Sequence, residues 1–347
     1  MELEIVLLPL RGPARVPSPL WRRYFFMQKP FKTINEQVKL LQARGLVIND
    51  IEQAEKYLLS NNYYNIINGY SKYFPRTGEQ YTNGTTFEEV SRLYLFDKEI
   101  KQSFFKATIA AESHLKSIFA YRFAEMYPNI PYAYLNINCY DSNKSLSVIS
   151  TIAKLSKIIN RYNSLKYRGS SIYHYIHKYN ELPIWVLVNY LDFGELRFML
   201  DASPTKLQNL IAKDFGEFIG QHIHSPFTFP PETLVSFLKN INEVRNVCAH
   251  NNRLLGFKCR QDLKYWSPIH SIFPTIPVSG TRSDVYSTFI SIQCFLSYTE
   301  YAMLHNSIRK SMNNHLKNHL TSVSPNTILH TLGFPDDWNL KIPKIVQ

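Results

Sequence analysis

The sequence predicts an all-α fold that forms a single elongated domain. Glycine is scarce, with 12 residues in a chain of 347, which disfavours a turn-rich β-sandwich and any glycine-loop nucleotide fold. Residues 86–127 contain neither glycine nor proline and repeat apolar residues every three or four positions, the spacing of an amphipathic helix. No internal repeat, low-complexity run or long polar linker divides the chain. Helices around one core are therefore the simplest interpretation.

Two short helices are expected near the start of this domain. Apolar residues at helical spacing predict a helix over residues 34–46, with Gly45 as a stop signal. A second helix is predicted over residues 51–59, because the Asp50 side chain can cap its first turn. The tyrosine-rich residues 61–70 are expected to form a turn.

The middle of the chain is expected to hold its longest helix. Residues 76–86 carry two glycines and several polar residues, which indicates a loop. The pattern over residues 86–127 then predicts one long helix or two in line, ended by Pro128. A further periodic helix is predicted over residues 146–162.

The second half of the chain alternates dense apolar runs with short breaks. The run that begins at Pro183 predicts a helix interrupted at Gly194, and a short helix is expected over residues 206–211. Two more helical patterns cover residues 232–252 and residues 284–315.

The charge balance favours a polyanionic partner. Lys and Arg total 39 against 27 Asp and Glu, a formal charge of +12, and such a surplus is typical of proteins that bind nucleic acid or an anionic membrane. It is equally compatible with solubility alone. No stretch approaches the roughly 18 to 20 uninterrupted apolar residues of a membrane-spanning helix. We therefore expect nucleic acid rather than a membrane as the partner.

The cysteine and histidine patterns indicate a cytoplasmic protein without a metal. Four cysteines are widely spaced and form no CxxC pair: Cys139, Cys248, Cys259 and Cys294. They suggest neither a disulfide framework nor a zinc knuckle. His222 and His224 lack a third ligand at a recognisable spacing, so a surface loop explains them better than a metal site. We expect no metal and no cofactor.

Residues 1–26 are expected to lie outside the conserved fold. MELEIVLLPL is a short apolar run that opens with two acids and is followed by a proline- and arginine-rich stretch. A secretory signal has the reverse order, with its positive charges before the apolar run. Met27 followed by QKPFKT is typical of a start. We therefore expect an N-terminal extension, or alternatively a loosely packed arm, before a helical domain over residues 27–347.

The helix predicted over residues 232–252 gathers the residues best suited to chemistry. Its apolar residues recur every three or four positions and define one buried stripe: Leu234, Phe237, Leu238, Ile241, Val244 and Cys248. Asn246, His250 and Arg253 are expected to share a different face, with Arg245 beside it on the same turn.

Arg245, Asn246 and His250 form the pattern R-N-x3-H, whose residue types suit metal-independent cleavage of RNA. A histidine with a near-neutral pKa can take the proton of the 2′-hydroxyl or protonate the leaving 5′-oxygen. An arginine can hold the phosphate through two hydrogen bonds and stabilise the charge of the transition state. Asn246 could hydrogen-bond to the imidazole and set its tautomer, or hold the phosphate.

The pattern alone is weakly specific. An arginine followed by a histidine also occurs at Arg168 with His174 and at Arg309 with His315, although neither arginine is followed by Asn. An exposed arginine and a histidine that interacts favourably with the helix dipole would explain the motif equally well.

The run NEVRNVCAHNNRLLGF over residues 242–257 resembles the signature of the Abi family of bacterial abortive-infection proteins, of the AbiD and AbiF type, which is a form of the HEPN ribonuclease motif. Five further runs resemble the family in the same order: KPFKTINEQVKLLQARGL, NNYYNIINGYSKYF, AAESHLKS, LPIWVLVNYLDFGELRFML and LGFPDDW. The resemblance covers residues 27–338 and departs at Asn189, where the family commonly has Glu.

The resemblance implies a HEPN-like helical bundle with additional helices and a metal-independent endoribonuclease that acts in phage defence. The reaction would leave 2′,3′-cyclic phosphate ends. A homodimer is implied, in which Arg245 and His250 of each protomer build a composite site, with a small RNA or a protein antitoxin as restraint. Glu112 lies where related proteins carry an acidic residue that can orient the arginine. An exposed helix glutamate is an equally good interpretation of Glu112.

Three questions stay open at this level. Basic residues after the motif are expected along an RNA path, although a solvated basic face explains them as well: Arg253, Lys258, Arg260 and Lys264. The tyrosines of residues 61–73 could stack on bases, but packing in the core is favoured. The alternative to a ribonuclease is a non-catalytic HEPN module that binds RNA or a protein partner, and such a module would tolerate the loss of His250.

Overall fold

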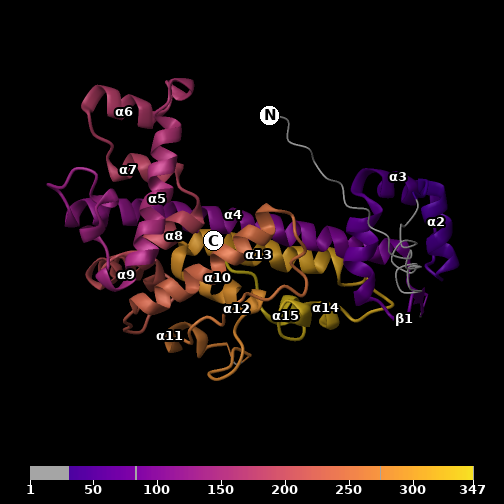
Figure 1. Ribbon diagram of the computed structural model, residues 1–347. Coiled ribbons are helices and arrows are strands. Elements are labelled where there is room, and N and C mark those ends of the chain that lie inside the picture. Colours follow the sequence, from indigo (N-terminus) through magenta and orange to yellow (C-terminus); the bar gives the residue numbers. More distant parts are fainter. Residues whose placement is uncertain (1–30, 83, 274, 347) are drawn as a thin grey trace, which may run out of the picture.

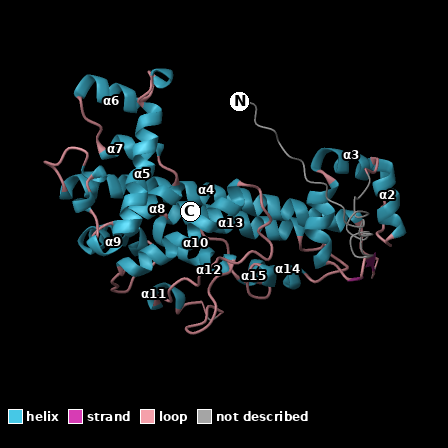
Figure 2. Cartoon of the chain, in the orientation of Figure 1, coloured by secondary structure: helices cyan, strands magenta, loops and turns pink. Residues whose placement is uncertain are grey.

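The computed structural model describes residues 31–82, 84–273 and 275–346, so the expected extension over residues 1–26 lies outside the described residues. The regular secondary structure of the described residues is almost entirely helical, as Figure 2 shows, and the predicted all-α fold is confirmed. Two short strands, β1 (Arg76–Thr77) and β2 (Gln80–Tyr81), form an antiparallel pair inside the stretch that the sequence predicts as a loop.

The first two helices agree with the sequence patterns. α2 (Ile34–Ala43) ends before Gly45, whose positive φ of 77° is a conformation that glycine adopts without strain. α3 (Ile51–Asn61) is capped by Asp50, whose side chain accepts a hydrogen bond from the Gln53 N–H. The tyrosine-rich turn that follows contains a π-helix (Tyr64–Asn68) and a 3-10 helix (Ser71–Tyr73).

The long apolar pattern forms one continuous helix, α4 (Phe87–Met126). Thr86 and Glu89 form a capping box at its start, because each side chain accepts a hydrogen bond from the other residue's backbone N–H. Buried side chains recur along its whole length. α5 (Ser145–Tyr162) follows as the sequence predicts.

The interruption predicted at Gly194 is misplaced. α7 (Ile184–Leu187) and a 3-10 turn end before Asp192, which begins α8 (Phe193–Ala202) through a capping box with Glu195. Gly194 therefore lies inside the first turn of α8. The break arises because the Asp192 side chain accepts a hydrogen bond from the Glu195 N–H and so starts a new helix. This cap decides where the helix begins, although glycine has a weak helix propensity.

The continuous pattern predicted over residues 284–315 is wrong as a single helix. It is divided into α12 (Val285–Ser291), a 3-10 turn (Ile292–Phe295) and α13 (Tyr298–His315). Leu296 is extended, and Ser297 caps α13 in a capping box with Glu300. Local capping again outweighs apolar periodicity.

Two other predicted helices differ in length from the sequence expectation. α9 (Thr205–Gly220) is longer than the predicted 206–211, and α10 (Pro231–Ala249) ends before the predicted boundary at residue 252. The described residues form four further helices: α6 (Ser171–Tyr179), α11 (Ser267–His270), α14 (Pro325–Thr331) and α15 (Trp338–Lys341). Short 3-10 turns lie between α4 and α5 (Ala133–Leu135, Ile137–Cys139 and Ser142–Lys144), between α5 and α6 (Leu165–Tyr167) and between α7 and α8 (Val188–Tyr190).

α4 is the axis of an elongated molecule (Figure 1). α10 and α13 pack along it, α2 and α3 lie beside its N-terminal end, and α5 and α8 lie toward its other end. The apolar core is continuous from the N-terminal helices to the chain around α15. α10 is thereby held against the centre of the molecule, which matters because it carries the Arg–His motif.

Within the described residues, no helix is long and apolar enough to cross a membrane. The four cysteines are free, and burial raises the pKa of each thiol.

Gly45→Ala is expected to lower the free energy of unfolding by about 1–2 kcal/mol, because a left-handed conformation strains any residue with a Cβ. The added methyl group would also stand 3.0 Å from the Tyr81 carbonyl oxygen. Urea denaturation measures the change. Gly169→Ala is the matched control, since a Cβ there meets no atom within 4 Å. Equal stability of both variants would contradict the proposed strain.

Candidate active site

α10 presents the motif because one of its faces is anchored in the core. Pro231 occupies the first turn, where its missing N–H is not needed. The predicted apolar stripe is buried from Leu234 to Val244, and Cys248 at its end is half-buried. Burial raises the pKa of Cys248 to about 12, so this thiol stays protonated and is a packing group rather than a nucleophile. The remaining face carries Arg245.

Glu112 of α4 holds the Arg245 side chain. The Arg245 Nη2 atom lies 3.8 Å from Glu112 Oε2, and the other oxygen of this carboxylate lies 2.8 Å from Lys116 Nζ. Glu112 is only 7% exposed, so its interpretation as an exposed helix glutamate is wrong. The guanidinium also lies over the Phe105 ring at 5.9 Å. A buried carboxylate and an aromatic face thus restrict Arg245 from two sides.

Arg245 retains donors for a ligand. Its side chain is 23% exposed, and its Nη1 atom donates a long hydrogen bond of 3.4 Å to Asn246 Oδ1. Its Nε also has no hydrogen-bond partner among the described residues, but this atom is buried, so a ligand would have to approach the partly exposed end of the guanidinium. An arginine that is oriented but incompletely paired is suited to an anionic group such as a phosphate.

His250 lies at the C-cap of α10 with an exposed side chain. Its backbone N–H donates to the Asn246 carbonyl at 3.0 Å, while the Asn246 side-chain oxygen accepts from Arg245 and not from the imidazole. Five helical residues correspond to a rotation of about 140°. Arg245 and His250 therefore leave the helix in different directions.

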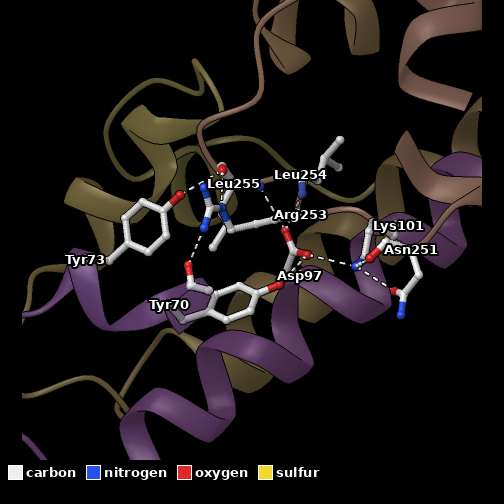
Figure 3. Close-up of polar contacts among 9 residues, drawn as sticks. Tyr70, Tyr73, Asp97, Lys101, Asn251, Arg253, Leu254 and Leu255 are labelled. Carbon is white, nitrogen blue, oxygen red and sulfur yellow. Dashed lines mark hydrogen bonds and ion pairs between the residues drawn. The ribbon is translucent and has the colours of Figure 1, made fainter. Parts of the chain in front are cut away.

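A buried polar network fixes the chain directly after His250 (Figure 3). Asp97 of α4 is fully buried, and its Oδ1 accepts the backbone N–H groups of Leu254 at 3.0 Å and Leu255 at 2.9 Å. Its Oδ2 accepts the Tyr70 hydroxyl at 2.7 Å and lies 3.1 Å from Lys101 Nζ. The carboxylate thus joins three distant parts of the chain.

Lys101 extends this network to the residue next to His250. Its ammonium donates to Asn251 Oδ1 at 2.8 Å, and Asn251 has a φ of 53°, a left-handed conformation that asparagine tolerates well. Burial, followed by the nearby Asp97 charge, raises the pKa of Tyr70, so its hydroxyl keeps the proton that it donates. The turn that carries His250 is thereby tied to α4.

Sequence analysis missed Asp97 and Lys101. Both lie on the apolar face of α4, between Leu93 and Phe104, one turn apart. Opposite charges four residues apart at positions that should be buried are a readable signal for a buried ion pair.

Arg253 does not share a face with His250, because α10 ends at Ala249. Its guanidinium donates to the Leu255 carbonyl at 3.2 Å and to the Gly69 carbonyl, and it lies 5.7 Å from the Tyr73 ring centroid. Figure 3 shows it between Tyr73 and Leu255. Arg253 thus joins the turn after α10 to the tyrosine-rich turn. Its guanidinium is engaged in contacts within the fold, so its main role is structural rather than the binding of RNA.

The tyrosines of this turn are mainly structural. Tyr70 is 3% exposed, and the Tyr73 hydroxyl donates to the Leu255 carbonyl at 2.7 Å. Tyr63 is half-buried, whereas Tyr64 is exposed.

The other three residues expected along an RNA path lie exposed on the surface: Lys258, Arg260 and Lys264. Arg260 is 86% exposed, and its Nε donates to Glu243 Oε1 at 3.0 Å. Lys258 is half-exposed, with its Nζ 3.8 Å from Asp284 Oδ2. Arg260, but not Lys258, lines a cleft together with Asn246.

His222 and His224 do not share an environment. The His222 ring lies 3.1 Å from the Leu296 carbonyl oxygen, and burial lowers its pKa, while His224 is exposed. Over the described ranges, no group of three or more His, Cys, Asp or Glu side chains could hold a metal ion.

Asp97→Asn is expected to lower the free energy of unfolding by about 3–5 kcal/mol, because it leaves Lys101 as a buried charge without its partner. Urea denaturation measures the loss. Glu52→Gln, which breaks the exposed pair with Lys56, is the control and should have no measurable effect. An Asp97→Asn variant as stable as the parent would show that the network does not anchor the turn.

A family model matches most of the helical core, including the motif. The model of a family described as Abi-like protein matches residues 56–256, which run from α3 through the motif and include Glu112, Arg245 and His250. No curated protein matches the chain, and no solved structure matches it.

Proposed function

This chain belongs to the Abi-like protein family, and from that premise we propose that it is a phage-defence protein of the AbiD and AbiF type that cleaves RNA as a metal-independent HEPN endoribonuclease. The observation that carries the proposal is the pairing of buried Glu112 with Arg245, beside an exposed histidine five residues further on. This arrangement places an oriented cation and a titratable group at one end of α10.

The chemistry assigns one role to each side chain. His250 takes the proton of the RNA 2′-hydroxyl, or gives a proton to the departing 5′-oxygen. The 2′-oxygen attacks the adjacent phosphorus and the P–O5′ bond breaks, which leaves a 2′,3′-cyclic phosphate and a 5′-hydroxyl. Arg245, held by Glu112, stabilises the negative charge that develops on the phosphate oxygens. Asn246 restrains Arg245 from the neighbouring position.

A homodimer would bring an Arg245 and a His250 side chain to the same phosphate, which the two side chains of one chain do not reach together. Since Arg245 and His250 leave α10 in different directions, a phosphate held by one protomer's Arg245 can meet a histidine of the other. Two-fold symmetry then brings two copies of the motif to one composite site. Cleavage of cellular or phage RNA in the bacterial cytoplasm would stop phage propagation, with a small RNA or a protein antitoxin as the restraint.

A non-catalytic HEPN module is the second candidate, and one observation favours it. Among the described residues no hydrogen bond holds the His250 imidazole, and the expected contact with Asn246 is not made. A general acid or base usually has a partner that sets its tautomer. A module that binds RNA or a protein partner needs no such group.

His250→Ala is expected to abolish RNA cleavage in EDTA while RNA binding persists, because the substitution removes the proton-transfer group and leaves the basic surface intact. Total RNA incubated with each protein, followed by mapping of the fragment ends, should yield 2′,3′-cyclic phosphates with the parent only. The control is His174→Ala, since His174 is also exposed and follows an arginine at similar spacing. Cleavage that survives in His250→Ala would refute the assigned site.

Mixed dimers of one Arg245→Ala and one His250→Ala protomer should regain about half of the parent activity, whereas both pure variants are inactive, because the intact Arg245 of one chain then faces the intact His250 of the other. Different affinity tags on the two chains allow the mixed dimer to be purified and assayed against both pure forms. A mixed dimer as inactive as the two pure variants would mean that each protomer carries an independent site.

A further inference from the structure

A basic cleft lies between α5, α8 and α10, toward one end of the molecule. Its volume is about 590 Å³, and Figure 1 shows these three helices close to one another. Asn242 and Asn246 of α10 line one wall, so the cleft begins directly beside the Arg245 contact. It therefore lies next to the candidate active site through Asn246, while Arg245 and His250 are not among its lining residues.

The cleft carries more positive than negative charge. Five cationic side chains line it: Lys154, Lys157, Arg161, Arg197 and Arg260. Its two carboxylates, Asp192 and Glu195, are engaged in the capping box of α8, where Asp192 Oδ1 accepts the Glu195 N–H at 2.7 Å and Glu195 Oε2 accepts the Asp192 N–H at 2.9 Å. Arg260 pairs with Glu243, whereas the other four cations form no ion pair within the described ranges.

Arg197 is the most constrained of these cations. Its guanidinium carbon lies 4.2 Å from the Phe198 ring centroid, and its Nε is buried with no hydrogen-bond partner among the described residues. Burial lowers the pKa of this guanidinium. Buried donors of a charged group are costly when unpaired, so an anion in the cleft would stabilise the arrangement.

The cations of α5 form a row rather than a single point. Lys154, Lys157 and Arg161 are spaced by three and four residues, so they share one helix face and span about 10 Å along it. All three residues are exposed. A row of this length suits successive phosphates of an extended strand better than one small anion.

We propose that this cleft binds the phosphodiester backbone of a single RNA strand next to the nucleotide that is cleaved. The inference rests on the proposed ribonuclease function, which it extends by assigning the path of the substrate. The α5 cations contact successive phosphates along the strand, and Arg197 donates to one of them. Asn246 lies where the strand passes from the cleft to Arg245. The path follows α5 and α8, away from Arg253 and Lys258.

The test measures RNA binding in full-length protein that also carries His250→Ala, so that the RNA stays intact. Fluorescence anisotropy of a labelled single-stranded RNA is recorded over a range of salt concentrations. Lys154→Gln combined with Lys157→Gln should weaken binding. It should also reduce the slope of log K against log salt by about 1.4, because each lost single-strand phosphate contact contributes about 0.7. Both lysines are exposed, so folding should be preserved.

The matched control removes the same charge elsewhere. Lys39 of α2 and Lys98 in the N-terminal half of α4 are exposed, and neither lines the cleft. α2 lies at the end of the molecule opposite to α5 (Figure 1). Lys39→Gln combined with Lys98→Gln should leave the slope unchanged. Arg197→Gln should weaken binding on its own, with circular dichroism confirming that it is folded. Equal effects of the two lysine pairs, or no effect of the cleft pair, would overturn the proposal.

The binding result is separate from the cleavage result. A parent protein that binds RNA through the cleft but leaves it intact would refute the ribonuclease and support the RNA path. A parent that cleaves RNA, with binding unaffected by the cleft pair, would support the ribonuclease and refute the path.

Discussion

The buried carboxylate of Asp97 is the contact on which the geometry of the site depends. Removing an unpaired carboxylate from water costs several kcal/mol, and only excellent pairing offsets that cost. Asp97 is paired with Lys101 and accepts hydrogen bonds from Tyr70, Leu254 and Leu255. These donors come from α4 itself, from the tyrosine-rich turn and from the chain after α10. Three parts of the fold are thus joined at one carboxylate.

This constraint places His250 between two anchors on the same long helix. Glu112 holds Arg245 before it, and Lys101 holds Asn251 directly after it. Because both anchors belong to α4, the end of α10 cannot turn relative to its support without breaking one of these part-buried polar contacts. The backbone at His250 is thereby fixed, while its imidazole remains exposed. Such an arrangement keeps the Arg245 guanidinium oriented and leaves the His250 imidazole accessible to a substrate.

Much of the helical framework could be predicted from the sequence, because apolar periodicity reports which face of each segment is buried. The long helix, the Asp50 cap and the stop at Gly45 all follow from local patterns. Periodicity failed where a polar residue caps a new helix inside an apolar run, as at Asp192 and Ser297. The apolar residues on either side keep their spacing, so only the cap reveals the break.

The candidate site could be predicted only in part for a different reason. Residue types suitable for RNA cleavage are visible in the motif, but the groups that orient them lie far away in the sequence. Asp97 precedes Leu254 by 157 residues, and Arg253 reaches a carbonyl 184 residues earlier. No local pattern shows such partners, and Arg253 therefore resembled a free surface cation. Charges on the buried face of α4 were the one local sign of the network.

The asymmetry between Arg245 and His250 links the fold to the proposed mechanism. Arg245 is restrained by a carboxylate, an aromatic ring and an amide, whereas His250 is held only through its backbone. Proton transfer requires the imidazole within hydrogen-bond reach of the reacting oxygen, and its partner is often supplied only when the substrate is bound. In the proposed dimer, the second protomer and the RNA strand would provide those contacts together. The His250 imidazole would then become oriented only when the dimer has formed and the RNA is bound. In an isolated chain, Arg245 is already oriented and His250 is not.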